Sequence, residues 1–345
     1  MITNRLRIIV RLLALPCALA ACATTPPSDP FDNEGAIWPA PPETGRIAFV
    51  TEFSGSSDLG IRKSVWARLI GLAAGNSEDR MLRPMAIAAT ADGSVVFVAD
   101  PDARCVHRYD IGRGRYDCMV PDDQSGITPI GLAITSEGQL FVSDSQNGRL
   151  LRASPGDDEL SPFAADVRFE RPTGMYWDSN SEQLFVTDTL GQVVVVVDTT
   201  GQLLMTLGER GSQAGQFNFP TYLCVDGDGE LLVTDSLNFR IQRFDEQRNF
   251  VQMFGENGDQ QGSFARPKGV AVDTSGHVYV VDSLLHTMQV FDRDGQLLLS
   301  VGVQGQAPGE FWLPNGIFVT DDDTIFVADS YNKRVQVFRY VGPRS

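Results

Sequence analysis

The chain has 345 residues, of which 42% are hydrophobic, and this is enough for one large domain or two small ones. Its formal net charge is −16 at pH 7. Such an excess of acidic groups repels phosphates, so the composition argues against nucleic-acid binding and against direct adhesion to anionic lipid.

Residues 1–21 have the composition of an export signal, with three arginines, an apolar run too short to span a membrane, and then small residues. The following "LAAC" resembles the bacterial lipobox, in which the cysteine, here Cys22, is lipidated and becomes the new N-terminus. Cys17 matches less well because proline precedes it, and an ordinary signal peptide ending near "ALA" is the alternative. Ala23 stands where an aspartate would favour the inner membrane, so we predict periplasmic anchoring in the outer membrane rather than the inner.

The region after the cysteine holds three segments. Residues 22–45 are rich in proline and acid without a periodic pattern, and we interpret them as a tether. The apolar stretch "RIAFVTEFSG" at 46–55 predicts a strand. Within 56–82, apolar residues form one helical stripe over 61–73, opposite a basic spot. We expect a short amphipathic helix that packs against the domain, or alternatively lies on a membrane surface.

From residue 83 onward one pattern recurs in six units. Each unit has an apolar strand, a Gly/Asp turn, a strand ending in aspartate, a second turn and a third strand, and a fourth follows in stretches such as "FVQMFG". The aspartates are spaced by 44 or 47 residues and are Asp100, Asp144, Asp188, Asp235, Asp282 and Asp329. Four antiparallel strands at this period are typical of a propeller blade rather than of a helical solenoid.

The sixth unit stops after its third strand, and the stretch 46–55 is a candidate for the missing fourth one. A strand from the N-terminus would close the ring and remove both free sheet edges. We therefore predict an all-β fold, a six-bladed β-propeller over residues 46–341. It has four antiparallel strands per blade, a last blade closed by the N-terminal strand, and one short helix inserted before blade 1.

The units resemble the NHL repeat. "RPKGVAVDTSGHVYVVDS" and "VADSYNKRVQVF" follow its pattern closely, and the resemblance recurs in all six units. Ala86 and Tyr222 depart from it, since each replaces a glycine. NHL propellers often serve as interaction platforms, and the resemblance therefore implies a binding role. The surface concerned is the top face, where the inter-blade loops meet the turns between second and third strands.

The repeated aspartates could form a ring that binds a cation, but each precedes a turn in which a carboxylate caps backbone N–H groups. We assign them a structural role, with Arg149, Arg240 and Arg334, five residues later, as possible partners. "DGDGE" at 226–230 and "TDDDT" at 320–324 look like calcium loops, yet they occupy the first hairpin turn of their blades, so turn chemistry suffices.

The cysteines of the domain have two expected roles. Cys105 and Cys118 lie in two strand-like runs joined by "IGRG", close to opposite each other, and an oxidising compartment permits a disulfide. We predict a Cys105–Cys118 bridge. Cys224, in the apolar "YLCVD", is interpreted as a small buried filler.

The residue before each glycine position is expected to line the central mouth of the ring. These residues are Met85, Ile130, Thr173, Thr221, Lys268 and Asn315, and Tyr222 adds a phenol at a glycine position. Some six-bladed propellers are enzymes with calcium or zinc on the axis. Here His107, His277 and His286 are expected in a third strand, a bottom turn and a top turn, where they cannot meet at one zinc ion. We therefore expect no metal, no cofactor and no catalytic residue.

Two hypotheses follow for function. The leading one is a monomeric, lipid-anchored scaffold that binds an envelope protein or peptide through its top face, because apolar side chains in turns mark interaction sites. The candidate residues are Leu190, Leu237, Phe239, Leu284, Leu285, His286 and Tyr331. The alternative is a hydrolase or lyase acting on a small molecule at the axial mouth, with Lys268, Asn315 and Tyr222 as polar candidates.

Overall fold

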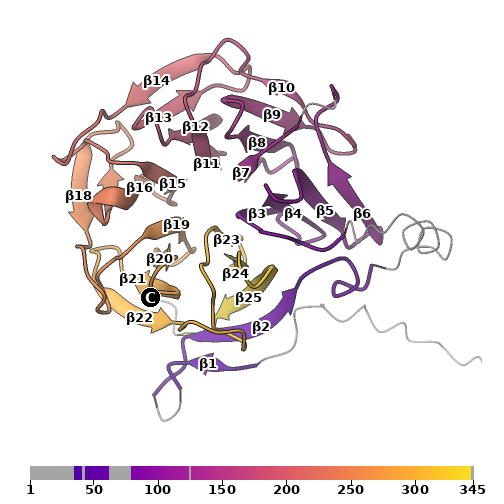
Figure 1. Cartoon of the computed structure of the whole chain (residues 1–345). Helices are drawn as coiled ribbons and strands as arrows, with labels where there is room; N and C mark the ends of the chain where they lie inside the picture. Colours follow the sequence, from indigo (N-terminus) through magenta and orange to yellow (C-terminus); the bar gives the residue numbers. More distant parts are fainter. Residues whose placement is uncertain (1–34, 41–42, 62–78, 124–125, 343–345) are drawn as a thin grey trace, which may run out of the picture.

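The computed structural model describes residues 35–40, 43–61, 79–123 and 126–342. The predicted signal peptide, Cys22 and the helix expected from residue 61 onward lie outside these residues, except for Ile61 itself. The described residues form six antiparallel sheets, which Figure 1 shows as a ring around a central axis. No helix within the described ranges is long and apolar enough to cross a membrane.

Five of the six sheets are built from consecutive strands, four to a sheet. Blade 1 contains β3 (Ala86–Ala89), β4 (Val95–Asp100), β5 (Cys105–Asp110) and β6 (Arg115–Met119). Blade 2 contains β7 (Pro129–Ile134), β8 (Leu140–Asp144), β9 (Arg149–Ala153) and β10 (Ser161–Phe163). Blade 3 contains β11 (Pro172–Asp178), β12 (Gln183–Asp188), β13 (Val193–Val197) and β14 (Leu203–Leu207).

The same order of strands continues in the second half of the chain. Blade 4 contains β15 (Pro220–Val225), β16 (Leu231–Asp235), β17 (Arg240–Phe244) and β18 (Phe250–Phe254), with the one-turn 3₁₀ helix η1 (Ser236–Asn238) between β16 and β17. Blade 5 contains β19 (Pro267–Val272), β20 (Val278–Asp282), β21 (Thr287–Phe291) and β22 (Leu297–Val301). The predicted all-β, six-bladed propeller with four antiparallel strands per blade is confirmed.

Blade 6 combines the two ends of the domain. It contains β23 (Ile317–Val319), β24 (Thr324–Asp329) and β25 (Arg334–Tyr340). The N-terminal β2 (Ile47–Phe53) pairs antiparallel with β25, from Ile47 opposite Tyr340 to Phe53 opposite Val335. As Figure 1 shows, β2 near the N-terminus and β25, the last strand, therefore lie side by side.

A fifth strand, β1 (Ile37–Trp38), pairs with the outer edge of β2. The Trp38 ring packs edge-on against Phe338, with 6.0 Å between ring centroids. Residues 35–40 of the segment interpreted as a tether are therefore ordered against blade 6. A two-residue strand is too short to produce a periodic pattern, so it could not be predicted from the sequence.

Burial follows the position of each strand in its blade. The inner strands lie between the sheets of two neighbouring blades, so both of their faces are covered, and strands β16 and β20 are buried throughout. The outermost strands β14 and β18 alternate between exposed and half-buried residues, because only one of their faces meets another blade. This explains why β13 can consist of five valines without exposing a hydrophobic surface.

The repeated aspartates are buried, none more than 4% exposed, and each accepts hydrogen bonds that hold its blade together. In blade 4, Asp235 accepts from the backbone N–H of Asn218 (2.6 Å), from Asn238 (2.8 Å), from Arg240 Nε (2.8 Å) and from Gln242 (3.0 Å). Arg149, Arg240 and Arg334 pair with the aspartates five residues before them at 2.8–2.9 Å. The structural role expected for the aspartates and their arginine partners is confirmed.

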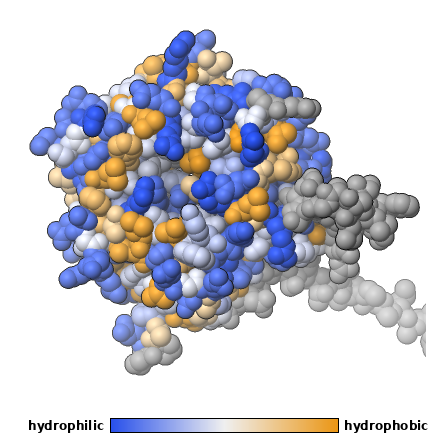
Figure 2. Space-filling model, viewed as in Figure 1, coloured by the Kyte–Doolittle hydropathy of each residue, from blue (hydrophilic) through white to orange (hydrophobic). Residues whose placement is uncertain are grey.

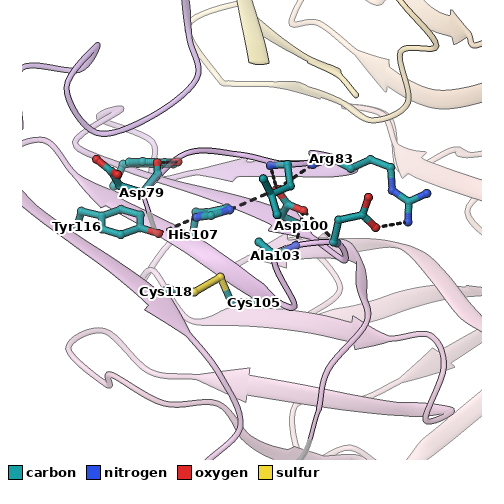
Figure 3. The surroundings of a disulfide bond; sticks show 11 residues. Asp79, Arg83, Asp100, Ala103, Cys105, His107, Tyr116 and Cys118 are labelled. Atoms are coloured by element: carbon teal, nitrogen blue, oxygen red, sulfur yellow. Dashed lines mark hydrogen bonds and ion pairs between the residues drawn. A yellow bond between two sulfur atoms is a disulfide. The ribbon is translucent and has the colours of Figure 1, made fainter. Parts of the chain in front are cut away.

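Blade 1 replaces this arrangement with a covalent one. Cys105 occupies the position of the paired arginine, five residues after Asp100, and forms a disulfide with Cys118 across a Cα–Cα distance of 5.6 Å. Figure 3 shows the bridge beside His107, whose Nδ1 lies 2.9 Å from the Tyr116 hydroxyl and whose Nε2 lies 3.4 Å from Asp100. The predicted disulfide is confirmed, although it runs diagonally, since Cys118 is directly opposite His107.

The expected calcium-like loops are turns held by their own side chains. Asp226 Oδ1 accepts the backbone N–H groups of Asp228 (3.0 Å) and Glu230 (2.9 Å), while its Oδ2 accepts from the buried Arg243 (2.9 Å). Thr320 and Asp322 form a similar turn in blade 6. Cys224 is a buried free thiol, as predicted, and burial raises its pKa.

Loss of the disulfide should destabilise the propeller. In the double variant Cys105→Ser, Cys118→Ser we expect the free energy of unfolding to fall by about 3 kcal/mol, because the unfolded chain is no longer constrained by a short covalent loop. Chemical denaturation with and without a reducing agent measures this. The reductant should lower the midpoint of the wild type to that of the variant and leave the variant unchanged. Equal midpoints for oxidised wild type and variant would contradict the prediction.

Removal of one repeated aspartate should have a comparable effect. In Asp329→Ala, the buried Arg334 loses its closest carboxylate partner, and Asn332 and Gln336 each lose one of their acceptors, so we expect a loss of about 3 kcal/mol. The control is Asp259→Ala, at an exposed position, which should change stability by less than about 0.5 kcal/mol. Thermal and chemical denaturation of both variants test this, and equal losses would show that burial of the carboxylate is not what matters.

Candidate functional site

The six innermost strands meet at the axis, and glycine permits their close approach. A Cβ at Gly174 would lie 2.6 Å from the carbonyl oxygen of Thr221, and one at Gly269 would lie 2.7 Å from the backbone nitrogen of Ile317. Both distances are shorter than van der Waals contact, so a side chain there would push neighbouring blades apart. Blade 4 departs from this rule, since Tyr222 takes the glycine position.

Tyr222 reaches across the axis from blade 4 to blades 1 and 6. Its hydroxyl lies 2.9 Å from the carbonyl oxygen of Met85 and 2.8 Å from Oδ1 of Asn315, and its single proton is shared between these acceptors. Burial raises the pKa of Tyr222, so the phenol stays neutral. The ring lines a cavity on each side, and it therefore divides the central channel in two.

The cavity towards the top face, which we call the axial cavity, has a volume of about 300 Å³. Every residue predicted for the mouth of the ring lines it, namely Met85, Ile130, Thr173, Thr221, Tyr222, Lys268 and Asn315. The repeat predicts this set of residues because equivalent positions in the first strand of each blade lie at the same place relative to the axis. The structure thus brings together the one lysine, the amide and the phenol named as polar candidates.

Two lining residues were missed by the sequence reasoning. Arg171 and Arg266 precede the prolines of "RPTG" and "RPKG", are exposed, and line the same cavity as Lys268. The recurring Arg-Pro pair was a usable signal, but it is ambiguous. In blade 1 the equivalent Arg83 is paired with Asp102 at 2.7 Å, whereas Arg171 and Arg266 make no ion pair with any described residue.

Three cations, Lys268, Arg171 and Arg266, lie around the axial cavity, whose wall is otherwise mostly apolar. Burial, and after it the neighbouring charges of Arg266 and Arg171, lowers the pKa of Lys268 to about 8, against the opposing effect of Asp282. A lysine in this state is still mainly protonated at pH 7 but loses its proton readily. The cavity is consequently a local concentration of positive charge in a protein with a net charge of −16.

The hydroxyl groups of the cavity wall fall into two classes. Thr173 Oγ1 is engaged, at 2.6 Å from Thr189 Oγ1 and 2.9 Å from the carbonyl oxygen of Thr221. The hydroxyl oxygens of Ser145 and Thr221 are buried and have no hydrogen-bond partner among the described residues. Buried hydroxyls without a partner are unusual and call for an explanation.

The predicted top-face residues differ in how much surface they offer. Leu284 (50% exposed), Tyr331 (49%), Leu190 (42%) and Leu237 (39%) lie in solvent. Two further apolar residues that the sequence reasoning omitted belong with them, Leu82 and Trp312. We call these six side chains the apolar ring. Leu237 also lines the axial cavity, so the two features are continuous.

The other three predicted top-face residues are only half-buried and serve the fold. Phe239 adopts a left-handed conformation that ends η1, and it packs against a core cluster. His286 Nδ1 accepts the backbone N–H of Leu313 at 3.1 Å and so holds the loop that enters blade 6. Leu285 donates its N–H to Asp282. On the face drawn in Figure 2, hydrophobic residues form separate patches among hydrophilic ones.

The cavity on the opposite side of Tyr222 is larger, about 1010 Å³, and is rimmed by the first hairpin turns. Its acidic residues include Asp178, Asp226 and Asp273. Each of them already accepts hydrogen bonds within its own turn, for example Asp273 from His277 Nδ1 and the Tyr279 hydroxyl, both at 2.8 Å. This acidic rim is therefore explained by turn structure.

The three histidines have separate local partners. His107 lies beside the disulfide, His277 contacts Asp273 in a bottom turn, and His286 holds a top loop. Within the described part of the chain, no group of three or more histidine, cysteine, aspartate or glutamate residues is placed to hold a metal ion. The histidines therefore act in the packing of individual blades.

Comparison with solved structures shows the same fold at low sequence identity. The chain is similar to selenomethionine-substituted virginiamycin B lyase from Staphylococcus aureus, with 13% identity, a TM-score of 0.58, and coverage of 86% of this chain and 99% of that one. An auxiliary nutrient binding protein from Bacteroides thetaiotaomicron gives 12% identity, a TM-score of 0.60, and coverage of 76% and 70%. A putative gluconolactonase gives 13% identity, a TM-score of 0.58, and coverage of 76% and 89%.

No curated protein sequence matches this chain. The model of the NHL repeat matches residues 217–244, 264–291 and 311–338, which correspond to blades 4, 5 and 6. Blades 4 and 6 keep the complete set of asparagine, arginine and glutamine around the buried aspartate, whereas blade 1 has a disulfide instead. The chain is therefore a protein with NHL repeats, folded as a six-bladed β-propeller.

Proposed function

We propose that the protein is a lipid-anchored scaffold of the bacterial envelope that binds a protein or peptide through its top face. The observation that carries this proposal is the apolar ring, with Leu284, Tyr331, Leu82 and Leu190 each more than two-fifths exposed. Exposed apolar side chains held on rigid turns lose little conformational entropy when a partner covers them. Polar residues of the same turns would form the rim of the interface.

The position of the N-terminal segment supports a tethered arrangement. The first described residues, 35–40, lie along β1 at the outer edge of blade 6, away from the axis. A tether that leaves the domain there would hold it by its side and leave the top face accessible. The lipid itself is proposed from the "LAAC" sequence that ends at Cys22.

A small-molecule hydrolase or lyase is the second candidate function. It is favoured by Lys268, whose pKa of about 8 would let it act as a base near neutral pH, inside an enclosed cavity. Similar structures include a lyase and a putative lactonase, but at 12–13% identity they share the fold alone.

Charged residues in the top turn of blade 5, which contributes Leu284 to the apolar ring, should strongly reduce partner capture. We expect the variant Leu284→Asp, Leu285→Asp to recover at least about tenfold less of the envelope proteins crosslinked by the wild type, because buried charges without partners oppose association. Quantitative mass spectrometry after crosslinking and pull-down measures this.

The matched control for that experiment is Leu203→Asp. Leu203 is 54% exposed, but it lies on β14 at the outer edge of blade 3 rather than on a top turn. This variant should recover the same proteins as the wild type. Equal losses in both variants, or no loss in either, would refute binding through the top face.

A further inference from the structure

We infer that the axial cavity binds an organic carboxylate with an apolar body, and that Lys268, Arg171 and Arg266 supply the positive charge that holds it. The ligand is a free acid or the carboxyl end of a peptide, which share this chemistry. The inference rests on the proposed function, because it names the chemical group that a partner on the top face would insert into the ring.

The first support is that the cations of the cavity lack counterions. Nine arginines of the described residues pair with carboxylates, namely Arg83, Arg108, Arg113, Arg115, Arg149, Arg240, Arg243, Arg293 and Arg334. Other exposed arginines, such as Arg104, Arg168 and Arg210, make no ion pair with a described residue, and these do not line the axial cavity. The side chains of Lys268, Arg171 and Arg266 make neither an ion pair nor a hydrogen bond with any described residue. Three cations that line one cavity without a carboxylate partner, in a chain with 44 acidic residues, favour the binding of an anion there.

The second support is the electrostatic repulsion among the three cations. Lys268 is half-buried, while Arg171 and Arg266 are exposed at the same cavity and lower its pKa. An anion bound beside these cations relieves their mutual repulsion. The only carboxylate that acts appreciably on Lys268 is Asp282. That carboxylate already accepts the backbone N–H groups of Ala265, Arg266, Leu284 and Leu285. Asp282 therefore cannot turn towards the cavity without breaking the blade.

The third support is that apolar and charged residues lie on different parts of the cavity wall. Met85, Ile130 and Phe219 give apolar surface, while blades 3 and 5 contribute the charges. The volume of about 300 Å³ is at the small end of ligand pockets and fits an acid with a single apolar group. The unpartnered hydroxyls of Ser145 and Thr221 could reach such an acid after rotation about χ1.

Direct observation of Lys268 tests the inference. The chain has three lysines, Lys63, Lys268 and Lys333, so carbon-13 labelling of the lysine side chains gives few, assignable NMR signals. The intact protein is titrated with N-acetyl-leucine, and with N-acetyl-leucinamide as the neutral control. We expect the acid to shift the Lys268 signal and to raise its pKa above about 8, and the amide to do neither.

The same interaction predicts a pH dependence with a definite sign. Lys268 must be protonated and the ligand ionised, so affinity for N-acetyl-leucine is constant between about pH 5 and pH 7 and falls as the pH rises through about 8. Lys268→Met should weaken binding about tenfold or more and remove this pH dependence. Lys268→Arg should keep the affinity and shift the fall beyond the measured range. Lys333→Met, at an exposed top turn, is the matched control and should change neither.

Two further arms identify the source of the carboxylate. In the first, an acetylated peptide that ends in a leucine carboxylate is compared with N-acetyl-leucine. If the peptide binds more tightly, and if Leu284→Asp removes this difference in affinity, the natural ligand is the carboxyl end of a peptide. Equal affinities for the peptide and the amino acid indicate a free acid.

Failure of this inference can be told apart from failure of the proposed function. If N-acetyl-leucine leaves Lys268 unchanged, or if its amide shifts the signal equally, the carboxylate site is refuted even when envelope partners are still captured through the apolar ring. If the acid binds but the Leu284→Asp, Leu285→Asp variant keeps its partners, the cavity site stands and the scaffold proposal fails.

Discussion

The structure depends on one buried interaction, the carboxylate that ends the second strand of every blade. In blade 4, Asp235 accepts the N–H of Asn218 from the loop before the first strand and side-chain donors from the turn and third strand after it. Each aspartate thereby joins the inter-blade loop to the top turn of its own blade. Because these two segments make up the top face, the same buried charge that stabilises the blade also fixes the surface available to partners.

Blades differ in the groups that donate hydrogen bonds to this carboxylate. Where backbone N–H groups or a disulfide take over, the side chains of the turn do not have to be polar. Blades 4 and 6 use asparagine, arginine and glutamine side chains. In blade 5 the donors in the turn are backbone N–H groups. Leu284 and Leu285 can therefore occupy this turn while Asp282 keeps its hydrogen bonds. Blade 1 places a disulfide at the arginine position, which suits an oxidising compartment. The apolar turn of blade 5 is thus tolerated by the fold because its polar partners are in the backbone.

The axis shows how one substitution within a repeat creates a site. Glycine at the innermost position lets neighbouring strands approach, and a tyrosine at that position in blade 4 fills the channel and separates its two ends. The resulting floor, held by Met85 and Asn315, converts an open channel into a closed-ended cavity beneath the apolar ring. Positive charge from blades 3 and 5 then gives that cavity a chemical character opposite to that of the molecule as a whole.

The sequence by itself determined the repeat, the blade count, the buried role of the six aspartates, the disulfide and the residues of the mouth. Each follows from local register, which a repeat preserves from one unit to the next. Tertiary structure alone decided that Tyr222 crosses the axis, that β1 joins blade 6, that Phe239 ends η1, and that His286 holds the loop into blade 6. It also decided that Arg171 and Arg266 stay unpaired while Arg83 does not. These outcomes depend on contacts between residues far apart in the chain or on single turn conformations, and no pattern within one repeat encodes them.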